Sequence, residues 1–311
     1  MKPILFMPIG LPGAGKSTYA KRLAEENNAV ILSSDDLRKE MFGDVNDQEH
    51  NAEVFAELHR RCKDLLSKQV NIIYDATNIR LKNRVAFLNE LKNIDCYKEA
   101  IVLATPYELC LENNLKRDRQ VPNEVIKRMR ENFHFPLYNE GFDEIEFVWN
   151  MGDMKFDVKA MLQKANDFEQ HNSHHTLSLG KHMWEAASKL TYYGGSIEDF
   201  NLLYAATRLH DIGKFETQTF FDKKGNISTE AHYYQHQHVG AYDAMFYLKQ
   251  YSQDSFDDKE ILHVCTLIQY HMHPYLGWKD SEKARRRDKQ LLGEDMFNEV
   301  MLLHKCDVEA H

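Results

Sequence analysis

Short apolar runs alternate with helical stretches through the first half of the chain. The runs are little interrupted by polar residues, which is typical of strands in a parallel sheet that is covered on both faces. Strands are expected at residues 4–9, 30–32, 71–74, 100–103 and 145–149. Helices are expected between them at residues 17–27, 51–68 and 81–91. The alternation predicts an α/β domain with a parallel sheet and helices on both of its faces.

The pattern changes after Trp149, where residues 150–153 form a short polar stretch. From His171 onward, apolar positions recur at helical spacing. Helices are expected at residues 177–190, 197–210, 236–251, 259–270 and 297–308. The one exception is residues 217–229, which predict a small hairpin. We therefore predict a second, all-α domain, with domains at residues 1–158 and 159–311.

The charge balance limits how the chain could hold nucleic acid. The net charge is −9, divided as 23 − 26 = −3 over residues 1–160 and 16 − 22 = −6 over residues 161–311. Neither half has the large positive field of a general nucleic-acid binder, so a polynucleotide would be held locally, at an end or in a groove. The basic run at residues 283–289 is expected to be a solvated loop face, with contact to a phosphate-rich substrate as the alternative.

Cysteine and hydropathy patterns indicate a cytoplasmic protein without membrane association. The 5 cysteines are scattered without C-x-x-C spacing, which suits a reducing compartment. No segment resembles a signal peptide, and no apolar run approaches the roughly 18 residues that span a bilayer. The sequence carries no signal for an oligomeric state.

Residues 10–18 read Gly-Leu-Pro-Gly-Ala-Gly-Lys-Ser-Thr between an expected strand and an expected helix. The pattern G-x-x-x-x-G-K-[ST] in this context predicts a phosphate-binding loop. Glycines aim backbone N–H groups inward, and the helix dipole adds positive potential at the same place. We predict ATP and Mg²⁺ here, with Lys16 at the β and γ phosphates and Ser17 on Mg²⁺. The predicted nucleotide-binding residues are Gly13, Ala14, Gly15, Lys16, Ser17, Thr18 and Asp75.

Polar residues follow the second and third expected strands, at the sheet edge where ligands bind in open α/β sheets. Asp35 is the candidate general base for an acceptor hydroxyl, and Arg38, one helical turn later, is expected to orient an acceptor phosphate. The alternative is that Asp35 or a neighbour only caps the next helix. Asp75 ends the third strand at the same edge.

Basic residues gather around Val121-Pro122 at helical spacing. They predict a lid that closes over the ATP phosphates, with a solvated basic helix as the alternative. They are Lys116, Arg117, Arg119, Arg128 and Arg130.

The order of these motifs over about residues 2–150 resembles the T4-type polynucleotide 5′-kinase domain. The resemblance implies transfer of the ATP γ-phosphate to a 5′-hydroxyl end, with Asp35 as base, Arg38 at the acceptor phosphate and Arg117 in the lid. The chain departs from that family in one place, where Asn113-Asn114 stands at the position of a further lid arginine.

The second half carries candidate metal ligands, and 13 of the 16 histidines lie after residue 160. His210-Asp211 ends an expected helix, and an imidazole beside a carboxylate suits divalent transition metals such as Mn²⁺, Ni²⁺, Co²⁺, Fe²⁺ or Zn²⁺. His182 and Asp307 lie on other helices with apolar neighbours, so all four residues can converge inside a bundle. A buried carboxylate is costly without a partner, and a metal is the simplest one.

The spacing of His182, His210-Asp211 and Asp307 resembles the HD-superfamily metal-dependent phosphohydrolases, over about residues 165–311. It is most similar to the HD domain of bacterial tRNA nucleotidyltransferases, which implies action on 2′,3′-cyclic phosphates. His236 and His271 fit the subset with an enlarged site, where a second ion would flank the displacement. Lys214 is predicted to neutralise the leaving phosphate, with an exposed helix-end lysine as an equal alternative.

Together the two halves predict nucleic-acid end healing, in which one domain removes a 2′,3′-cyclic phosphate or 3′-phosphate and the other phosphorylates a 5′-hydroxyl. RNA is favoured over DNA because the HD resemblance leans toward tRNA-processing enzymes. One alternative is a nucleoside or other small-molecule kinase fused to a nucleotidase. Another is an HD phosphohydrolase that ATP gates with little phosphoryl transfer.

Overall fold

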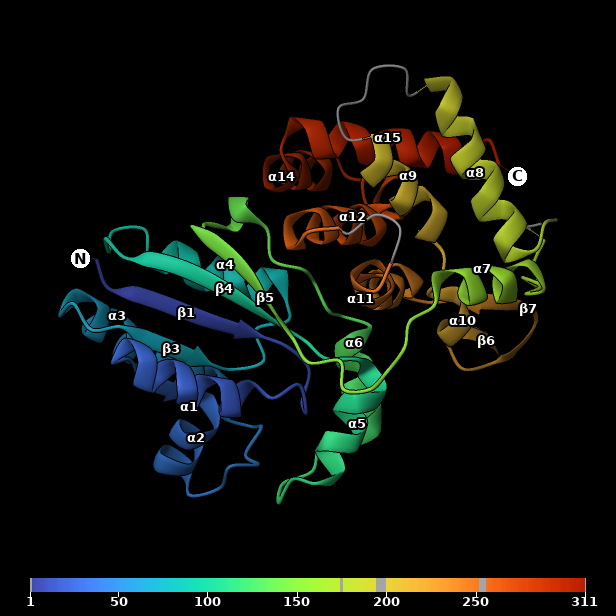
Figure 1. The fold of residues 1–311 in the computed structure, drawn as a ribbon. Helices are drawn as coiled ribbons and strands as arrows, with labels where there is room; N and C mark the ends of the chain where they lie inside the picture. Colours follow the sequence, from blue (N-terminus) through green and yellow to red (C-terminus); the bar gives the residue numbers. More distant parts are fainter. Residues whose placement is uncertain (1, 174–175, 194–199, 252–255, 311) are drawn as a thin grey trace. The chain divides into compact units, whose positions relative to one another are not determined.

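The computed structural model describes residues 2–173, 176–193, 200–251 and 256–310. The chain divides into two compact units (Figure 1). Unit 1 is Met1–Met129 with Pro136–Gly152, and unit 2 is Arg130–Phe135 with Asp153–His311. No sequence pattern indicated that the short segment Arg130–Phe135 belongs with the second unit.

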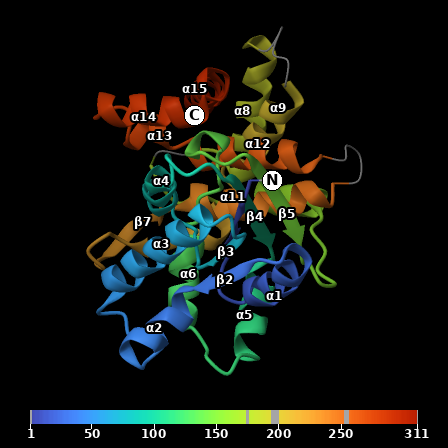
Figure 2. The same ribbon diagram turned by 90° about the vertical axis from the view of Figure 1, so that its left-hand side faces the viewer.

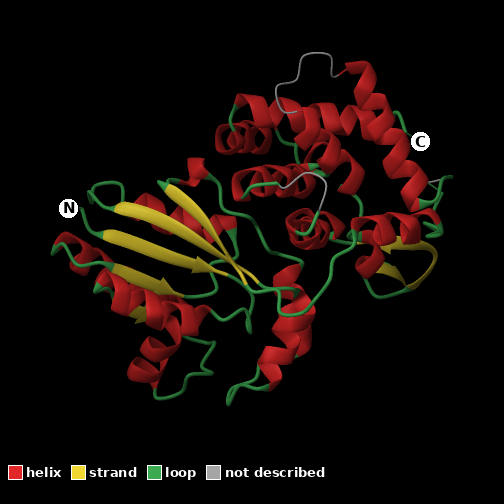
Figure 3. Ribbon diagram, in the orientation of Figure 1, coloured by secondary structure: helices red, strands yellow, loops and turns green. Residues whose placement is uncertain are grey.

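Unit 1 contains a parallel sheet of five strands in the order β2-β3-β1-β4-β5, drawn as yellow arrows in Figure 3. The strands are β1 (Ile4–Ile9), β2 (Val30–Ser33), β3 (Ile72–Asp75), β4 (Tyr97–Ala104) and β5 (Glu144–Trp149). Leu5, Ile9 and Val102 of the central strands have no exposed surface. The predicted parallel α/β sheet is therefore confirmed, because helices cover apolar residues on both of its faces.

The helices of unit 1 include the three that were predicted and several that were not. They are α1 (Lys16–Asn27), α2 (Ser34–Phe42), α3 (Asn51–Ser67), α4 (Leu81–Glu90), α5 (Tyr107–Leu115) and α6 (Asn123–Arg130), with a 3₁₀ turn at Tyr138–Glu140. Helix α2 follows β2 directly, and its cap is Ser33, whose hydroxyl accepts a hydrogen bond from the backbone N–H of Asp36. Capping by Ser33 leaves the Asp35 carboxylate available for other contacts.

The described residues of unit 2 form helices and one hairpin, as predicted. Its helices are α7 (Val158–Asn166), α8 (Leu179–Tyr193), α9 (Phe200–Leu209), α10 (Lys214–Thr217), α11 (His236–Lys249), α12 (Asp258–Tyr270), α13 (His273–Leu276), α14 (Glu282–Leu292) and α15 (Glu294–Val308). The hairpin pairs β6 (Gln218–Phe221) with β7 (Ile227–Tyr233) in antiparallel register. Residues 197–199, which begin one predicted helix, lie outside the described residues.

Helices α11 and α12 form the centre of unit 2, and the views in Figures 1 and 2 show them side by side. Ala241, Met245, Val264 and Leu267 on these helices have no exposed surface. Helix α12 also packs against α9 and α15. Within the described part of the chain, the search for a helix with the length and hydropathy to cross a bilayer found none.

The prediction of a loop at residues 283–289 was wrong, because these residues lie within helix α14. Ser281 caps this helix by accepting a hydrogen bond from the backbone N–H of Ala284. Only Asp288 and Leu292 of the helix are buried. With so few apolar positions, the segment shows no helical periodicity in sequence.

A buried ion pair holds α4 to the turn before β5. Arg84 donates to both carboxylate oxygens of Glu140 at 2.8 Å, and the two side chains are 1% and 0% exposed. Glu140 also accepts a hydrogen bond from the backbone N–H of Leu137. Arg84 thus serves the packing of unit 1.

Replacing Glu140 by Ala is expected to destabilise unit 1 by about 3–5 kcal/mol, because it removes the carboxylate that faces a buried guanidinium. Urea unfolding of the full chain measures the loss, and peptide-resolved hydrogen exchange assigns it to unit 1. Glu140→Gln keeps a hydrogen-bond acceptor and should lose less. Equal unfolding midpoints for all three proteins would show that the pair contributes nothing.

Candidate functional site

The phosphate-binding loop lies between β1 and α1, as the motif predicts. Gly13 and Gly15 have φ angles of +86° and +92°, in the left-handed region that side chains rarely adopt. A Cβ atom on Gly13 would lie 2.1 Å from the carbonyl oxygen of Cys110 on α5. Ala14 is buried, and its carbonyl accepts a hydrogen bond from the Thr105 hydroxyl at 3.1 Å. The loop is therefore built closely against α5 and the end of β4.

Lys16 is held inside this loop by backbone carbonyls. Its Nζ donates to the carbonyl oxygens of Gly10 at 2.8 Å and Leu11 at 2.9 Å. Burial lowers the pKa of Lys16 to about 8, although the Asp75 carboxylate acts in the opposite direction. A phosphate group beside this ammonium would compensate for its lost hydration.

A hydroxyl and a carboxylate meet at the end of β3. The Ser17 hydroxyl donates to Asp75 at 3.3 Å. Burial raises the pKa of Asp75, which Lys16 and Ser17 oppose. Oxygen donors are the ligands that Mg²⁺ prefers, so this pair fits the predicted ion. Thr18 lies exposed in the first turn of α1.

Asp35 is contacted by two arginines from different parts of unit 1. Arg38 donates to its Oδ1 and Arg119 to its Oδ2, both at 2.8 Å. Arg117 is exposed, and its charge helps to lower the pKa of Lys16. The structure therefore brings both Asp35 and Arg117 near the phosphate loop.

The predicted lid is a helix, a short loop and a second helix, comprising α5, residues 116–122 and α6. Asn114 closes the loop, because its side chain donates to the carbonyl of Val121 and accepts from the backbone N–H of Val121. Asn113 donates to the carbonyl of Gly13 at 3.1 Å. Arg130 does not act as a lid cation here, because it is buried and paired with Asp243 within unit 2.

The predicted metal ligands converge in the interior of unit 2 as two groups of three. In each group, one ligand atom from each residue lies within 4.8 Å of the others, and every residue is buried. The groups are His182, His210 and Asp307, and Asp211, His236 and His271. Helices α8, α11 and α15 and the segments after α9 and α12 supply them, so residues far apart in sequence form one centre.

The Asp211 carboxylate faces both groups. Its Oδ2 lies 3.4 Å from Nε2 of His210 and 3.6 Å from Nε2 of His182. Its Oδ1 lies 3.1 Å from Nε2 of His236 and 3.7 Å from Nε2 of His271. This is the arrangement of a carboxylate that could bridge two ions.

Three histidines are oriented by backbone carbonyls three residues earlier in the chain. Nδ1 of His210, His236 and His271 lies 2.8, 2.8 and 2.6 Å from the carbonyl oxygens of Thr207, Tyr233 and Ile268. A carbonyl only accepts, so Nδ1 carries the proton and Nε2 presents a lone pair to the centre. Nε2 of His236 and Nε2 of His271 are 3.2 Å apart. Two lone pairs at this distance call for a cation between or beside them.

The charges of the centre lead to the same conclusion. Burial alone would lower the pKa of His210, but the Asp211 and Asp307 carboxylates outweigh it and raise that pKa to about 10. A proton on Nε2 would then supply the positive charge that a bound metal ion would replace. Burial alone would raise the pKa of Asp211, but Lys214 and His210 outweigh it and hold that pKa well below its usual range. Buried carboxylates of this kind need positive charge nearby, and the nitrogen and oxygen donors fit a divalent transition metal.

Lys214 is buried and is not an exposed helix-end lysine. Its Nζ donates to Asp211 Oδ2 and to Gln170 Oε1, each at 2.7 Å. Sequence reasoning missed Gln170 and also Tyr275, whose hydroxyl donates to Asp307 Oδ2 at 2.8 Å. Neither residue lies in a recognisable motif, so no sequence signal could have found them.

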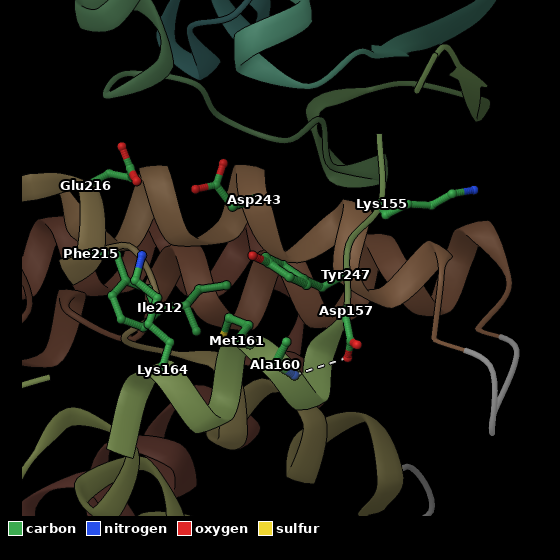
Figure 4. A pocket seen from close by; sticks show the side chains of 10 residues that line it. All are labelled: Lys155, Asp157, Ala160, Met161, Lys164, Ile212, Phe215, Glu216, Asp243 and Tyr247. Carbon is green, nitrogen blue, oxygen red and sulfur yellow. Dashed lines mark hydrogen bonds between the residues drawn. The ribbon is translucent and has the colours of Figure 1, made fainter. Parts of the chain in front are cut away.

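Unit 2 also has an open hollow of about 330 Å³, which is lined in part by residues that follow Asp211 in the chain (Figure 4). Ile212 and Phe215 line it together with Lys164 of α7 and Tyr247 of α11. None of the predicted metal ligands is among its lining residues. The hollow is therefore separate from the two groups of candidate metal ligands.

Comparison with known proteins matches the two halves of the chain to two different families. Residues 5–136 match the AAA domain family, and residues 179–310 match the HD domain family. The chain therefore joins a P-loop domain to an HD domain, and the predicted combination is confirmed.

The chain is similar to L-seryl-tRNA(Sec) kinase of Methanococcus maripaludis, with 30% identity over 50% of this chain and 59% of that protein. It is also similar to a protein of Acanthamoeba polyphaga mimivirus whose name describes it as a bifunctional polynucleotide phosphatase/kinase, with 28% identity over 47% of this chain and 33% of that protein. A solved structure of the Pnkp1/Rnl/Hen1 RNA repair complex shares 26% identity over 41% of this chain and 42% of its own, with a TM-score of 0.36. The chain thus spans less than two thirds of each of these proteins.

ATP affinity is expected to fall about tenfold between pH 7 and pH 9, because Lys16 loses its proton near pH 8 without ligand and ATP phosphates would keep it charged. Titration calorimetry with Mg²⁺-ATP measures the dissociation constant at each pH. Lys16→Met should bind more weakly and without this pH dependence. An unsubstituted chain whose affinity does not change over this range would contradict the assignment.

His236→Ala is expected to lower bound metal from two ions to one, whereas Asp211→Asn should lose both, because the Asp211 carboxylate has one oxygen near each group. Metal content after loading with Mn²⁺ and gel filtration gives the count. His273→Ala is a matched control outside both groups. Equal metal content in His236→Ala and the unsubstituted chain would exclude a second metal-binding position that depends on His236.

Proposed function

We propose that this chain, a P-loop domain joined to an HD domain, is a bifunctional nucleic-acid end-healing enzyme. One domain would transfer the γ-phosphoryl group of ATP to a 5′-hydroxyl end. The other would hydrolyse a 2′,3′-cyclic phosphate or a 3′-phosphate with a divalent metal. RNA is the favoured substrate, because the HD resemblance leans toward tRNA-processing enzymes.

One observation carries this proposal. A phosphate loop with an adjacent carboxylate that two arginines contact occurs in the same chain as a buried histidine and carboxylate centre. Both arrangements handle phosphate, and the ends that a ribonuclease leaves require both reactions before a ligase can join them. The mimivirus relative also combines the names phosphatase and kinase.

In the kinase reaction, Asp35 would take the proton of the acceptor hydroxyl as the new oxygen–phosphorus bond forms. Lys16 would hold the β and γ phosphates, and Ser17 with Asp75 would hold Mg²⁺. Arg117 would stabilise charge on the transferred group from the lid side. The products are ADP and a 5′-phosphate end.

In the hydrolase reaction, a bound divalent ion would supply Lewis acidity and lower the pKa of a water molecule. His182, His210, Asp211 and Asp307 would hold the first ion, and His236 and His271 would complete the second position. Lys214 places a positive charge on the same carboxylate, where it would help to stabilise negative charge on the phosphate.

A second candidate is a kinase whose acceptor hydroxyl is not a polynucleotide 5′ end. The similarity to L-seryl-tRNA(Sec) kinase favours it, because that name specifies a different acceptor. The acidic charge of both halves and Asn113-Asn114 are also compatible with small acceptors. ATP gating of the HD domain, without transfer, is a third possibility.

A labelled-ATP assay with Mg²⁺ tests the kinase half against a 5′-hydroxyl RNA oligonucleotide, the matching DNA, nucleosides and seryl-tRNA. Label in the oligonucleotides alone supports end healing, and label in nucleosides or seryl-tRNA alone supports the second candidate. Release of 3′ phosphate from RNA ends with Mn²⁺ tests the other half. If all 2′,3′-cyclic and 3′-phosphate ends stay unchanged, the proposed hydrolase activity is excluded.

The two activities are expected to separate by mutation. Asp35→Asn should lower 5′-phosphorylation by about 10²–10⁴-fold, because it removes the general base, while ATP binding and 3′-end hydrolysis stay unchanged. His210→Ala should abolish hydrolysis and spare the kinase. Control of hydrolysis by ATP that persists in Asp35→Asn, together with no phosphorylation of any acceptor by the unsubstituted chain, would instead support a gating role for the first domain.

A further inference from the structure

We propose that helix α14 binds the phosphate backbone of the polynucleotide whose 3′ end the HD domain would hydrolyse. The binding surface is the α14 stripe, formed by the side chains of Lys283, Arg286 and Arg287. The inference rests on the proposed hydrolase function and deepens it, because it names the surface that would hold a polymer rather than a free nucleotide.

The three cations of the α14 stripe lie on one face of the helix. Arg286 and Arg287 follow Lys283 by three and four residues, the spacing at which side chains share a helix face. All three residues are exposed, and the side chains of Arg286 and Arg287 are 73% and 64% exposed. The helix buries Asp288 and Leu292 instead. The stripe is therefore the face that α14 presents to solvent.

Carboxylates neutralise little of the charge on this face. Within the described part of the chain, Lys283 forms no ion pair. Glu282 lies 3.8 Å from Arg286 with both side chains exposed, where an ion pair contributes little. Arg287 contacts Asp288 through Nε and Nη2, and a guanidinium has further N–H donors. All three cations therefore keep donors for an anion.

The charge of this segment contrasts with that of its surroundings. Residues 279–289 include 6 basic and 3 acidic residues, a net charge of +3, within a half of the chain whose net charge is −6. Like charges three and four residues apart repel one another and oppose helix formation, whereas a face that serves solubility mixes both signs. A bound polyanion would relieve this repulsion.

Hydrogen bonds join α14 to the segment that follows the candidate metal ligand His271 (Figure 2). Oδ2 of the buried Asp288 lies 3.0 Å from Nδ1 of His273 and accepts from the indole N–H of Trp278 at 2.9 Å. Tyr275, in the same segment, donates to a carboxylate of the metal centre. A strand held by α14 would therefore lie against the segment that borders this centre.

The occupant that these observations favour is a single-stranded polynucleotide. Its phosphates repeat along the strand and match cations that repeat along one helix face, and the adjoining centre carries candidate ligands for phosphate hydrolysis. Contacts to the backbone carry no base information, so they suit an enzyme that accepts ends of any sequence. An acidic protein segment would meet the same charges but would have no use for the metal centre.

Fluorescence anisotropy with a 5′-phosphorylated, 3′-hydroxyl RNA oligonucleotide tests the proposal in the full chain loaded with Mn²⁺. Neither proposed reaction can act on this probe, so binding is measured without turnover. Replacing all three stripe residues by Gln should raise the dissociation constant about 10–100-fold at low salt. The slope of log affinity against log salt should become shallower by about 2, since each phosphate contact of a single strand contributes about 0.7.

A matched control changes the net charge equally at other places in unit 2. It replaces three exposed lysines, Lys159, Lys224 and Lys259, by Gln and should bind the probe as the unsubstituted chain does. Changing Arg286 and Arg287 to Lys keeps the charges and should retain most of the affinity. Hydrolysis of a nucleoside 2′,3′-cyclic phosphate, which has no further phosphates, should be unchanged in the stripe variant.

The outcomes separate failure of the surface from failure of the proposed function. Equal weakening in the stripe and control variants would assign RNA affinity to net charge and overturn the proposal. Unchanged RNA affinity in the stripe variant would also overturn it, and would leave α14 as a solvated face or as a surface for another partner, such as an acidic protein. Either result is compatible with hydrolysis of 3′ ends. Stripe-dependent binding without hydrolysis of any 3′ end would refute the hydrolase function and keep the RNA-binding surface.

Discussion

The burial of the Asp211 carboxylate sets the requirements that the rest of unit 2 meets. Asp211 is 3% exposed, so the protein must replace the water that this charge would otherwise bind. Histidine nitrogens approach both of its oxygens, and Lys214 donates to one of them. Side chains from α8, α11 and α15 and from the segments after α9 and α12 thus meet at this centre.

The ends of helices orient the histidine rings of this centre. His210 and His271 follow the last residues of α9 and α12, and each ring donates through Nδ1 to a carbonyl three residues earlier. Those carbonyls belong to the last turn, where helical hydrogen bonding leaves acceptors without partners. One contact therefore satisfies a helix end and selects the tautomer that presents Nε2. His236, at the start of α11, obtains the same orientation from Tyr233 in the hairpin.

Short-range patterns explain which parts were predictable from the sequence. The strands, the phosphate loop and the hairpin follow from apolar runs and glycine positions, and the ligand types of the metal centre follow from His210-Asp211 and its apolar surroundings. The partners Gln170 and Tyr275 could not be predicted, because each contact joins segments with no shared local pattern. Helix α14 was missed because its surface is almost wholly polar. Asn113 and Asn114 appeared only as a departure from a family, whereas the structure shows amides that fix the lid loop and the phosphate loop.

Charge also explains why contacts near the reacting atoms matter so much in this chain. With a net charge of −9, its overall field does not attract a polyanion at long range. For the proposed polynucleotide substrate, affinity would then come from a few short contacts, and those beside Asp35 would be made by the terminal nucleotide. A chain that binds in this way would distinguish an end from the interior of a strand, because an interior segment offers no 5′-hydroxyl to Asp35 and gains little from the remaining surface of unit 1. Weak general attraction is thus compatible with end recognition, since it keeps the site free of the far more abundant internal phosphates.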